Sequence, residues 1–337
     1  MQIYNRPRAA IGILALGLAV AACGTTREDN QTSTGGDSGT AEPISGLSIM
    51  VPNDPGSGYD TTARTAAKAM EDAGLTDTVE VFNVPGAGGT VGLQQTVNDA
   101  GNEDLLLQMG LGVVGAVYTN QSEATLEDTT PVARLIEEAE AIVVPADSPY
   151  STLDQLVDAW TADPAGIPVG GGSSPGGPDH LTPMLLAQAV GVEPTEVNYV
   201  AYDGGGELLA ALLGSKVAFG ATGVGEIAEQ AKAGELKILA VTSEQPVPGV
   251  DAPTLTESGV DLVFSNWRGL VAPPEISDDA KQQFIDLITE MHDSDEWKAA
   301  LEENGWIDAF ITGDEYATFL QDEDERVSEV LAQLGLA

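Results

Sequence analysis

Cationic residues, cysteine and histidine are all scarce in this chain. Of its 337 residues, 13 are Lys or Arg, two are His and one is Cys, against 53 Asp and Glu, so the formal net charge is −40. A single Cys cannot form an intramolecular disulfide, and one Cys with two His cannot complete a Cys/His zinc site. Such an acidic body is repelled by nucleic acid and by anionic membrane surfaces. We therefore expect no metal, no cofactor and no nucleic-acid partner.

The acidic residues are spread along the chain rather than gathered in one tail. They occur in stretches such as LIEEAEA, LEEN and QDEDER. This distribution is typical of a solvated surface that keeps a protein soluble. We expect most of these carboxylates to face solvent.

The N-terminal segment has the pattern of an exported lipoprotein. Arg6 and Arg8 precede an apolar run, residues 9–20, that is too short to span a bilayer as a permanent helix. The run ends in VAAC, which resembles the bacterial lipobox and predicts a signal peptide over residues 1–22 with lipidation of Cys23. The alternative is a buried structural cysteine. Residues 23–45 are polar and rich in Gly, Ser and Thr, which predicts a flexible tether. We expect the protein on the outer face of the cytoplasmic membrane, held there by its lipid alone.

The remaining chain alternates short β-rich runs with helical patterns, which predicts an α/β fold with largely parallel sheets. Its length favours two α/β domains, the first formed by residues 46–143 and 267–337 and the second by residues 144–266. STLD, residues 151–154, is expected to begin a helix in the manner of a capping box, and TGDE, residues 312–315, is expected to begin the last helix. The expected strands are Leu47–Val51, Val79–Asn83, Leu105–Met109, Ala141–Val144, Pro168–Gly170, Val197–Val200, Val217–Gly220, Leu236–Val241 and Leu270–Ala272.

Four glycine-rich loops link expected strands to expected helices. They are PNDPGSGYD, with Asp60 or Thr61 as the expected helix cap, VPGAGG, GGGSSPGGPD and YDGGGE. Glycine is needed where the backbone adopts positive φ or where a ligand approaches the main chain closely. A helix N-terminus there offers unpaired N–H groups and partial positive charge, which suit an anion. A protein of net charge −40 can therefore hold a carboxylate with groups that carry no formal charge, although each loop alone could be only a tight turn.

Three enzyme motifs are weak or absent. No GK[ST] tripeptide follows the glycines, so there is no P-loop. GAGGTVG, residues 86–92, fits a dinucleotide-binding pattern only loosely. GSSPG, residues 172–176, matches a hydrolase nucleophile elbow, but Pro175 has no N–H to give to an oxyanion hole. These observations favour a binding protein over an enzyme.

The ordered motifs of residues 47–337 resemble those of the substrate-binding proteins of tripartite tricarboxylate transporters, the TctC or Bug family. The resemblance rests on VPNDPGSGYDTTAR, NVPGAGGTVG, DTTPVARL, GSSPGGPDHL, NYVAYDGGGELLAALLGSKVAFG, GELKILAVTSE, APTLTESGVD and NWRGLVAPP. It implies a type II periplasmic-binding-protein fold, in which two α/β domains are joined by a hinge around a ligand cleft. It also implies that the first two loops hold carboxylates.

By motif position, the resemblance places ligand contacts on thirteen residues. From the first domain these are Ser57, Gly58, Tyr59, Asp60, Ala87, Gly88 and Gly89, and from the second domain they are Ser173, Ser174, His180, Tyr202, Asp203 and Thr222. Arg64, the only cation in the first two loop motifs, is expected to form a structural ion pair rather than to contact the ligand.

Two departures from the family pattern bear on the ligand. Asp203 stands where the family usually has Lys, and Tyr59 is expected to bring a ring into the mouth of the pocket. An acid beside a tricarboxylate lowers affinity, whereas Asp203 could pair with an ammonium or hydroxyl group. The expected function is a monomeric binding lipoprotein that delivers a small organic acid to the large and small membrane subunits of such a transporter. The alternatives are an exported enzyme and a ligand sensor that use the same cleft.

Overall fold

The computed structural model describes residues 45–202 and 204–337. The predicted signal peptide, the predicted lipidation site Cys23 and the predicted tether as far as residue 44 lie outside the described residues, as does Asp203. Within the described part, no helix is long and apolar enough to cross a membrane.

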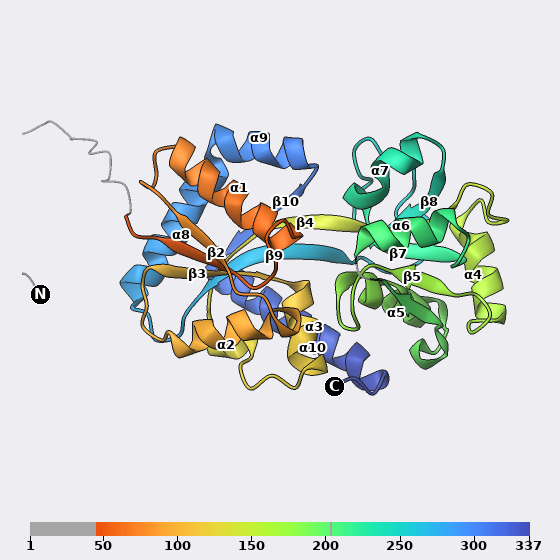
Figure 1. Cartoon of the computed structure of the whole chain (residues 1–337), viewed down its shortest axis with the longest axis horizontal. Coiled ribbons are helices and arrows are strands. Elements are labelled where there is room, and N and C mark those ends of the chain that lie inside the picture. The colour runs from red at the N-terminus through yellow and green to blue at the C-terminus, as the bar shows by residue number, and fades with distance from the viewer. Residues whose placement is uncertain (1–44, 203) are drawn as a thin grey trace, which may run out of the picture. The chain divides into compact units, whose positions relative to one another are not determined.

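The described residues form a mixed α/β structure around one ten-stranded sheet (Figure 1). The strand order is β2-β1-β3-β9-β4-β7-β5-β6, with β8 and β10 also paired to β4. The strands are β1 Ser48–Val51, β2 Glu80–Asn83, β3 Leu105–Gly110, β4 Thr130–Pro145, β5 Val169–Gly171, β6 Tyr199–Ala201, β7 Phe219–Gly223, β8 Leu236–Val241, β9 Ser265–Ala272 and β10 Ile307–Thr312.

Ten α-helices and three short 3₁₀ helices join these strands in the described residues. The α-helices are α1 Gly58–Asp72, α2 Thr90–Asn98, α3 Leu111–Thr119, α4 Leu153–Ala162, α5 Pro178–Val190, α6 Gly205–Leu213, α7 Val224–Lys232, α8 Asp278–Asp293, α9 Asp295–Asn304 and α10 Gly313–Gln333. The 3₁₀ helices are η1 Ala87–Gly89, η2 Leu126–Asp128 and η3 Pro194–Glu196.

Strand β4 connects two groups of elements because its pairing changes along its length. Residues 130–139 pair with β9, and residues 140–145 pair with β7 and β8. The first group comprises β1–β3, β9, β10, α1–α3 and α8–α10, and the second comprises β5–β8 and α4–α7; Figure 1 shows β4 and β9 running between them. The change of pairing at Glu140 falls a few residues before the predicted boundary at residue 143. The division into two domains stays a prediction.

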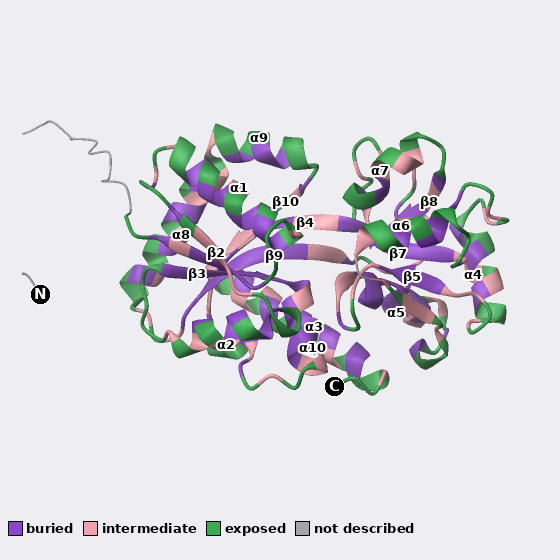
Figure 2. Cartoon of the chain, in the orientation of Figure 1, coloured by how far each residue is buried: buried purple, intermediate pink, exposed green. Residues whose placement is uncertain are grey.

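Each group has its own apolar core. In the first group a single large cluster includes Ile49, Met50 and Trp267, and in the second group separate clusters lie about Trp160 and Leu208. The strands are buried along most of their length, whereas the outer helices alternate between buried and exposed residues, as Figure 2 shows. This alternation is expected of amphipathic helices that cover a sheet.

Helix α5 is buried more completely than its neighbours. Leu181 and Met184 belong to the core of the first group, while Leu186 and Ala187 belong to a core of the second. Because apolar contacts hold the helix on two sides, its N-terminus has a fixed position against the first group of elements.

Most of the expected strands are confirmed within two or three residues, but three expectations are wrong. Strand β4 begins at Thr130 rather than near Ala141, β9 begins at Ser265 rather than at Leu270, and β10 was not expected. The sheet is mixed rather than largely parallel, because β4 is antiparallel to β7, β8, β9 and β10. The charged stretch LIEEAEA hid the first part of β4, since three glutamates in seven residues are unfavourable for a strand.

The helix starts expected at residues 151–154 and 312–315 are confirmed. Thr152 is the N-cap of α4, and its Oγ1 accepts a hydrogen bond from Gln155 N. Thr312 is the N-cap of α10. At α1 the expected cap is wrong: Ser57, not Asp60 or Thr61, is the N-cap, and its Oγ accepts from Asp60 N at 3.3 Å.

Candidate ligand-binding cleft

A cavity of ≈ 760 Å³ is lined by residues of both groups of elements. This volume suits a small organic ligand. We call one side of the cavity the first wall, formed by Ser57, Gly58, Ala87, Gly88 and Arg268. We call the other side the second wall, formed by Ser173, Ser174, Asp179, Gly205 and Glu226.

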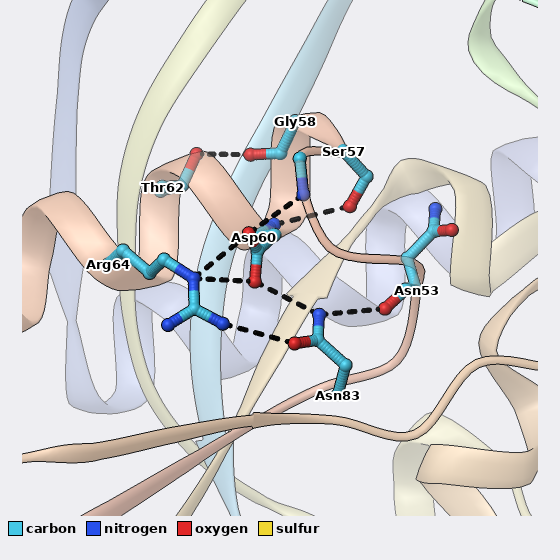
Figure 3. Close-up of polar contacts among 8 residues, drawn as sticks. Asn53, Ser57, Gly58, Asp60, Thr62, Arg64 and Asn83 are labelled. Atoms are coloured by element: carbon cyan, nitrogen blue, oxygen red, sulfur yellow. Dashed lines mark hydrogen bonds and ion pairs between the residues drawn. The ribbon is translucent and has the colours of Figure 1, made fainter.

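The loop before α1 is held together by one carboxylate (Figure 3). Asp60 Oδ2 accepts a hydrogen bond from Gly56 N at 2.8 Å, and its Oδ1 pairs with Arg64 Nε at 2.9 Å. Asn83 Nδ2 donates to the same carboxylate at 3.0 Å. Burial alone would raise the pKa of Asp60, but the hydrogen bonds from Arg64, Gly56 and Asn83 outweigh it and hold that pKa below its usual value.

Because of these contacts, neither Arg64 nor Asp60 lines the cavity. Arg64 forms the expected ion pair with Asp60, and it does not line the cavity. Asp60 is 4% exposed and shapes the loop instead of facing the cavity. The charge of Asp60 is paired inside the loop. The groups that remain to face the cavity include Ser57 and the first N–H groups of α1.

The second glycine-rich loop has an unusual run of positive φ angles. Gly86, Ala87, Gly88 and Gly89 have φ of 140°, 47°, 65° and 104°. A Cβ added to Gly88 would lie 2.7 Å from Ala116 Cβ, and one added to Gly89 would lie 2.8 Å from Val113 Cγ2. The expectation of positive φ at Gly88 is confirmed, and contact with α3 adds a second reason for glycine there. Ala87 and Gly88 line the cavity, whereas Gly89 is buried behind them.

Tyr59 lines the cavity and is largely buried. Its side chain is 9% exposed, and its ring lies against Gly110, where an added Cβ would be 2.9 Å from the phenol oxygen. That oxygen accepts backbone N–H groups of Gly112 and Val113. Burial, partly offset by the nearby Arg268 charge, raises the pKa of Tyr59. The ring therefore packs the start of α1 against the start of α3.

The carboxylate of Asp179 holds the third loop together by hydrogen bonds, as the carboxylate of Asp60 holds the first loop. Asp179 Oδ2 accepts from Gly172 N at 2.6 Å, and its Oδ1 accepts from Ser173 Oγ at 3.0 Å. Ser173 and Ser174 line the cavity as expected. His180 lies under the loop: its Nδ1 accepts from Gly176 N at 3.2 Å, and burial lowers the pKa of its ring to about 4.

Two other residues that were predicted to contact the ligand also lie outside the cavity lining. Thr222 is fully buried and donates its Oγ1 hydrogen to Glu226 Oε2 at 2.9 Å. The Tyr202 ring lies against β5, since a Cβ on Gly170 would be 3.2 Å from it. Neither residue lines the cavity. The predicted contacts that do line it are Ser57, Gly58, Tyr59, Ala87, Gly88, Ser173 and Ser174.

Sequence reasoning missed Arg268, which lines the first wall from β9. Its side chain is 9% exposed, forms an ion pair with Glu138, and donates from Nη1 to Thr62 Oγ1 at 3.3 Å. A Cβ on Gly58 would overlap the guanidinium, so glycine lets the arginine reach the start of α1. The motif NWRGLV contained the signal, but the expected strand began only at Leu270. Strand β9 in fact begins at Ser265 and carries Asn266 and Arg268 into the cavity.

The second wall is acidic in a way that the expectation of a solvated acidic surface did not foresee. Asp179 is 7% exposed and Glu140, on β4 behind it, is fully buried. Burial and the nearby Glu226 charge raise the pKa of Asp179 to about 6. Burial and the neighbouring carboxylates raise the pKa of Glu140 well above its usual value. Within the described residues, no group of three or more His, Cys, Asp or Glu side chains could hold a metal ion.

The chain is similar to curated proteins named UPF0065 and Bug. The chain is 28% identical over 265 residues to the UPF0065 protein in the gbd 5′ region of Cupriavidus necator, covering 77% of this chain and 78% of that protein. It is 26% identical over 310 residues to BugT of Bordetella pertussis, covering 88% of this chain and 94% of that protein.

Solved structures show the same fold. A TctC solute-binding protein from Polaromonas superposes with a TM-score of 0.73 at 24% identity, covering 87% of this chain and 99% of that one. MatC from Rhodopseudomonas palustris with bound malate gives a TM-score of 0.69 at 21% identity, covering 86% and 99% of the two chains. An R. palustris protein with adipate gives 0.71 at 20% identity, covering 87% and 98%. The fold is that of a periplasmic binding protein, as expected.

The family model of the tripartite tricarboxylate transporter family receptor matches residues 62–336. These residues include most of α1, all of η1 and β9, and all of the second wall. Members of this family are solute-binding receptors rather than enzymes. The chain therefore belongs to the tripartite tricarboxylate transporter receptor family.

Proposed function

We propose that this protein captures a small carboxylate in the cavity between the first and second walls and delivers it to the membrane subunits of a tripartite tricarboxylate-type transporter. The observation that carries the proposal is the composition of the first wall. There the start of α1, the positive-φ loop at Gly88 and the guanidinium of Arg268 all border one cavity. N–H groups at a helix start and a guanidinium are the groups that proteins use to bind carboxylates.

The relatives support a carboxylate ligand. Proteins with this fold hold malate and adipate, which are both dicarboxylates. We propose that the ligand's carboxylate binds on the first wall and that Ser173 and Ser174 contact it from the second. Asp60, Gly89, His180, Tyr202 and Thr222 support the cavity from behind.

A thermal-shift screen over mono-, di- and tricarboxylates tests the proposal. A ligand present at about 100 times its Kd stabilises the folded state by about 2.7 kcal/mol, which gives a clear rise in melting temperature. We expect at least one small carboxylate to do so in a saturable manner. If none of them shifts the melting temperature, and isothermal titration gives no heat, the proposed function is wrong.

We further propose that the chain is a monomer that Cys23 anchors by lipid to the outer face of the cytoplasmic membrane. The VAAC motif supports this, together with the polar segment that follows it. Cys23→Ala should move the protein from the membrane fraction to the soluble extracytoplasmic fraction, with ligand affinity unchanged. Retention of the variant on membranes would contradict the anchor.

A further inference from the structure

The charges that border the cavity are divided between its two walls. Among the lining residues that the structure describes, Arg268 provides the cation of the first wall, and Asp179 and Glu226 provide the anions of the second. Arg268 is already paired with Glu138. A ligand that carried only carboxylates would find its counter-charges on one side and two carboxylates on the other.

The two carboxylates of the second wall have no cationic partner among the described residues. Asp179 accepts from Gly172 N and Ser173 Oγ, and Glu226 accepts from Thr222 Oγ1, so their contacts are with neutral donors. They are close enough for the Glu226 charge to be the second cause, after burial, of the raised Asp179 pKa. Two neighbouring carboxylates without a cationic partner favour a cation placed beside them.

Glu140 gives an independent indication of an absent partner in the same place. It lies on β4 with Ile142 on the sheet face that α5 covers, because side chains two residues apart point to the same face. The carboxylates that act on it most strongly are Asp179 and Glu226. The side chain is fully buried, yet neither Oε1 nor Oε2 has a hydrogen-bond partner among the described residues. Buried carboxyl oxygens are normally paired, so this unpaired carboxyl shows that the second wall lacks donors and positive charge.

We propose that the ligand carries a protonated amino group as well as a carboxylate, with the amino group beside Asp179 and Glu226 and the carboxylate on the first wall. This inference rests on the proposed function and narrows its substrate class to amino acids and similar zwitterions. An ammonium group has three donors, which would reach Asp179 and Glu226 at the cavity surface. Its positive charge would also favour the charged form of Glu140 behind them and so lower the raised pKa of that carboxyl.

The test uses pairs of acids that differ only in the amino group. Succinate is compared with aspartate, and glutarate with glutamate, by isothermal titration of the full chain at pH 7.5 and 150 mM salt. We expect one amino-bearing member to bind at least 10-fold more tightly than its partner. Glu226→Gln and Asp179→Asn should each reduce that preference by about 10-fold or more, mainly by weakening the amino-bearing ligand.

Two controls separate this site from general acidity. Glu229→Gln removes a charge from an exposed position one turn further along α7, outside the cavity lining, and should leave the preference unchanged. 1,4-Diaminobutane should bind at least 10-fold more weakly than the preferred amino acid, because it has no carboxylate for the first wall. If it binds as tightly, attraction to a chain of net charge −40 explains the result and the inference fails.

The remaining outcomes are distinguishable. If amine-free acids bind as tightly as or more tightly than their amino-bearing partners, the inference fails while the proposed function stands. If no acid of either kind binds, both fail. The Asp179 carboxylate also holds its own loop through the hydrogen bond from Gly172 N, so a loss of preference in Asp179→Asn counts only if that variant keeps its fold. Glu226→Gln is the deciding variant, because the carboxylate of Glu226 accepts a hydrogen bond from one threonine hydroxyl.

Discussion

The loop before α1 and the loop before α5 both lead from a strand into a helix, and both place an aspartate in the first turn of that helix. Each aspartate accepts a hydrogen bond from a loop glycine, Gly56 N for Asp60 and Gly172 N for Asp179. Asp60 also has Arg64, and its pKa is lowered. Asp179 has Glu226 nearby instead, and its pKa is raised to about 6.

The difference between Asp60 and Asp179 shows that two loops of similar local structure can give two kinds of binding surface. Where the loop neutralises its own carboxylate, the uncharged N–H groups of the helix start face the cavity and favour an anion. Where the carboxylate has no cation from the chain, it keeps its attraction for a cation on the ligand. A cleft built from one loop of each kind is polarised from wall to wall.

The largest expected effect is an opposite pH dependence of stability at the two aspartates. The pKa of Asp179 rises from 3.8 in an ordinary setting to about 6, so the folded protein holds a proton between these values that the unfolded chain lacks. The free energy of unfolding contributed by this group therefore falls as the pH rises from 4 to 6, by about 2 kcal/mol of the total of about 3 kcal/mol that the full shift represents. The stability of Asp179→Asn relative to the parent protein should therefore be higher above pH 6 than at pH 4.

Asp60→Asn is the matched variant with the opposite sign. The pKa of Asp60 is lowered, so its charged form contributes stability above its ordinary pKa that is lost as the pH falls. Urea unfolding at pH 4 and pH 7 measures both differences. Equal pH trends for the two variants would contradict the contrast between the loops.

Bringing the two walls together depends on Gly115 of α3. A Cβ there would overlap the carbonyl oxygen of Gly176, which belongs to the third loop. Overpacking a tight contact costs about 1–3 kcal/mol, so Gly115→Val should weaken ligand binding by roughly 10- to 100-fold while leaving the two cores intact. Gly225→Val is the control, because nothing lies within 4 Å of a Cβ at that helix position. Isothermal titration that gives the same Kd for both variants would show that the contact is dispensable.

Gly88 tests the N–H groups of the first wall. Its φ of 65° disfavours a side chain by about 1–2 kcal/mol, and the new Cβ would meet Ala116. Gly88→Ala should therefore weaken carboxylate binding by about 10-fold. Gly74→Ala, at φ 71° with open space around it, imposes similar backbone strain outside the cavity lining and should leave the Kd unchanged. Equal losses of affinity in both variants would mean that strain, not the wall, is responsible.

The smallest effect is expected at Arg64. Its side chain is half exposed and its partner is Asp60, so solvent screens the pair and its contribution is at most about 1 kcal/mol. Arg64→Gln should change the ligand Kd by a factor of about five or less. Complete loss of binding in a folded Arg64→Gln protein would mean that an ordinary salt bridge holds the carboxylate.

The sequence predicted the glycine-rich loops well and the charged residues poorly. Gly86, Gly88 and Gly89 could be recognised because a positive φ restricts the choice of residue to glycine almost alone. A cap offers no such restriction: Ser57, Asp60 and Thr61 are all good capping residues, and only the structure shows that Ser57 takes that position.

Burial of charge could not be predicted in the same way. Glu140 lies in a stretch of glutamates that resembles a solvated helix face, and its burial follows from the pairing of β4 with β7 and β8. Arg268 was missed for a related reason, because its place in the cleft depends on β9 pairing with β3 and β4 across distant parts of the chain. Long-range pairing of this kind leaves little trace in local sequence.

The titration of Asp60 and Asp179 by carboxyl-carbon NMR tests the central contrast most directly. With ¹³C-labelled aspartate, and with Asp60→Asn and Asp179→Asn to assign the two signals, the ligand-free protein should show Asp60 titrating below the usual range and Asp179 near pH 6. A saturating ligand with an amino group and a carboxylate should lower the pKa of Asp179, because a cation beside it favours the charged form, and should leave Asp60 unchanged. If Asp179 titrates in the ordinary range in the free protein, or if its pKa rises when the ligand binds, the division of charge between the two walls is wrong.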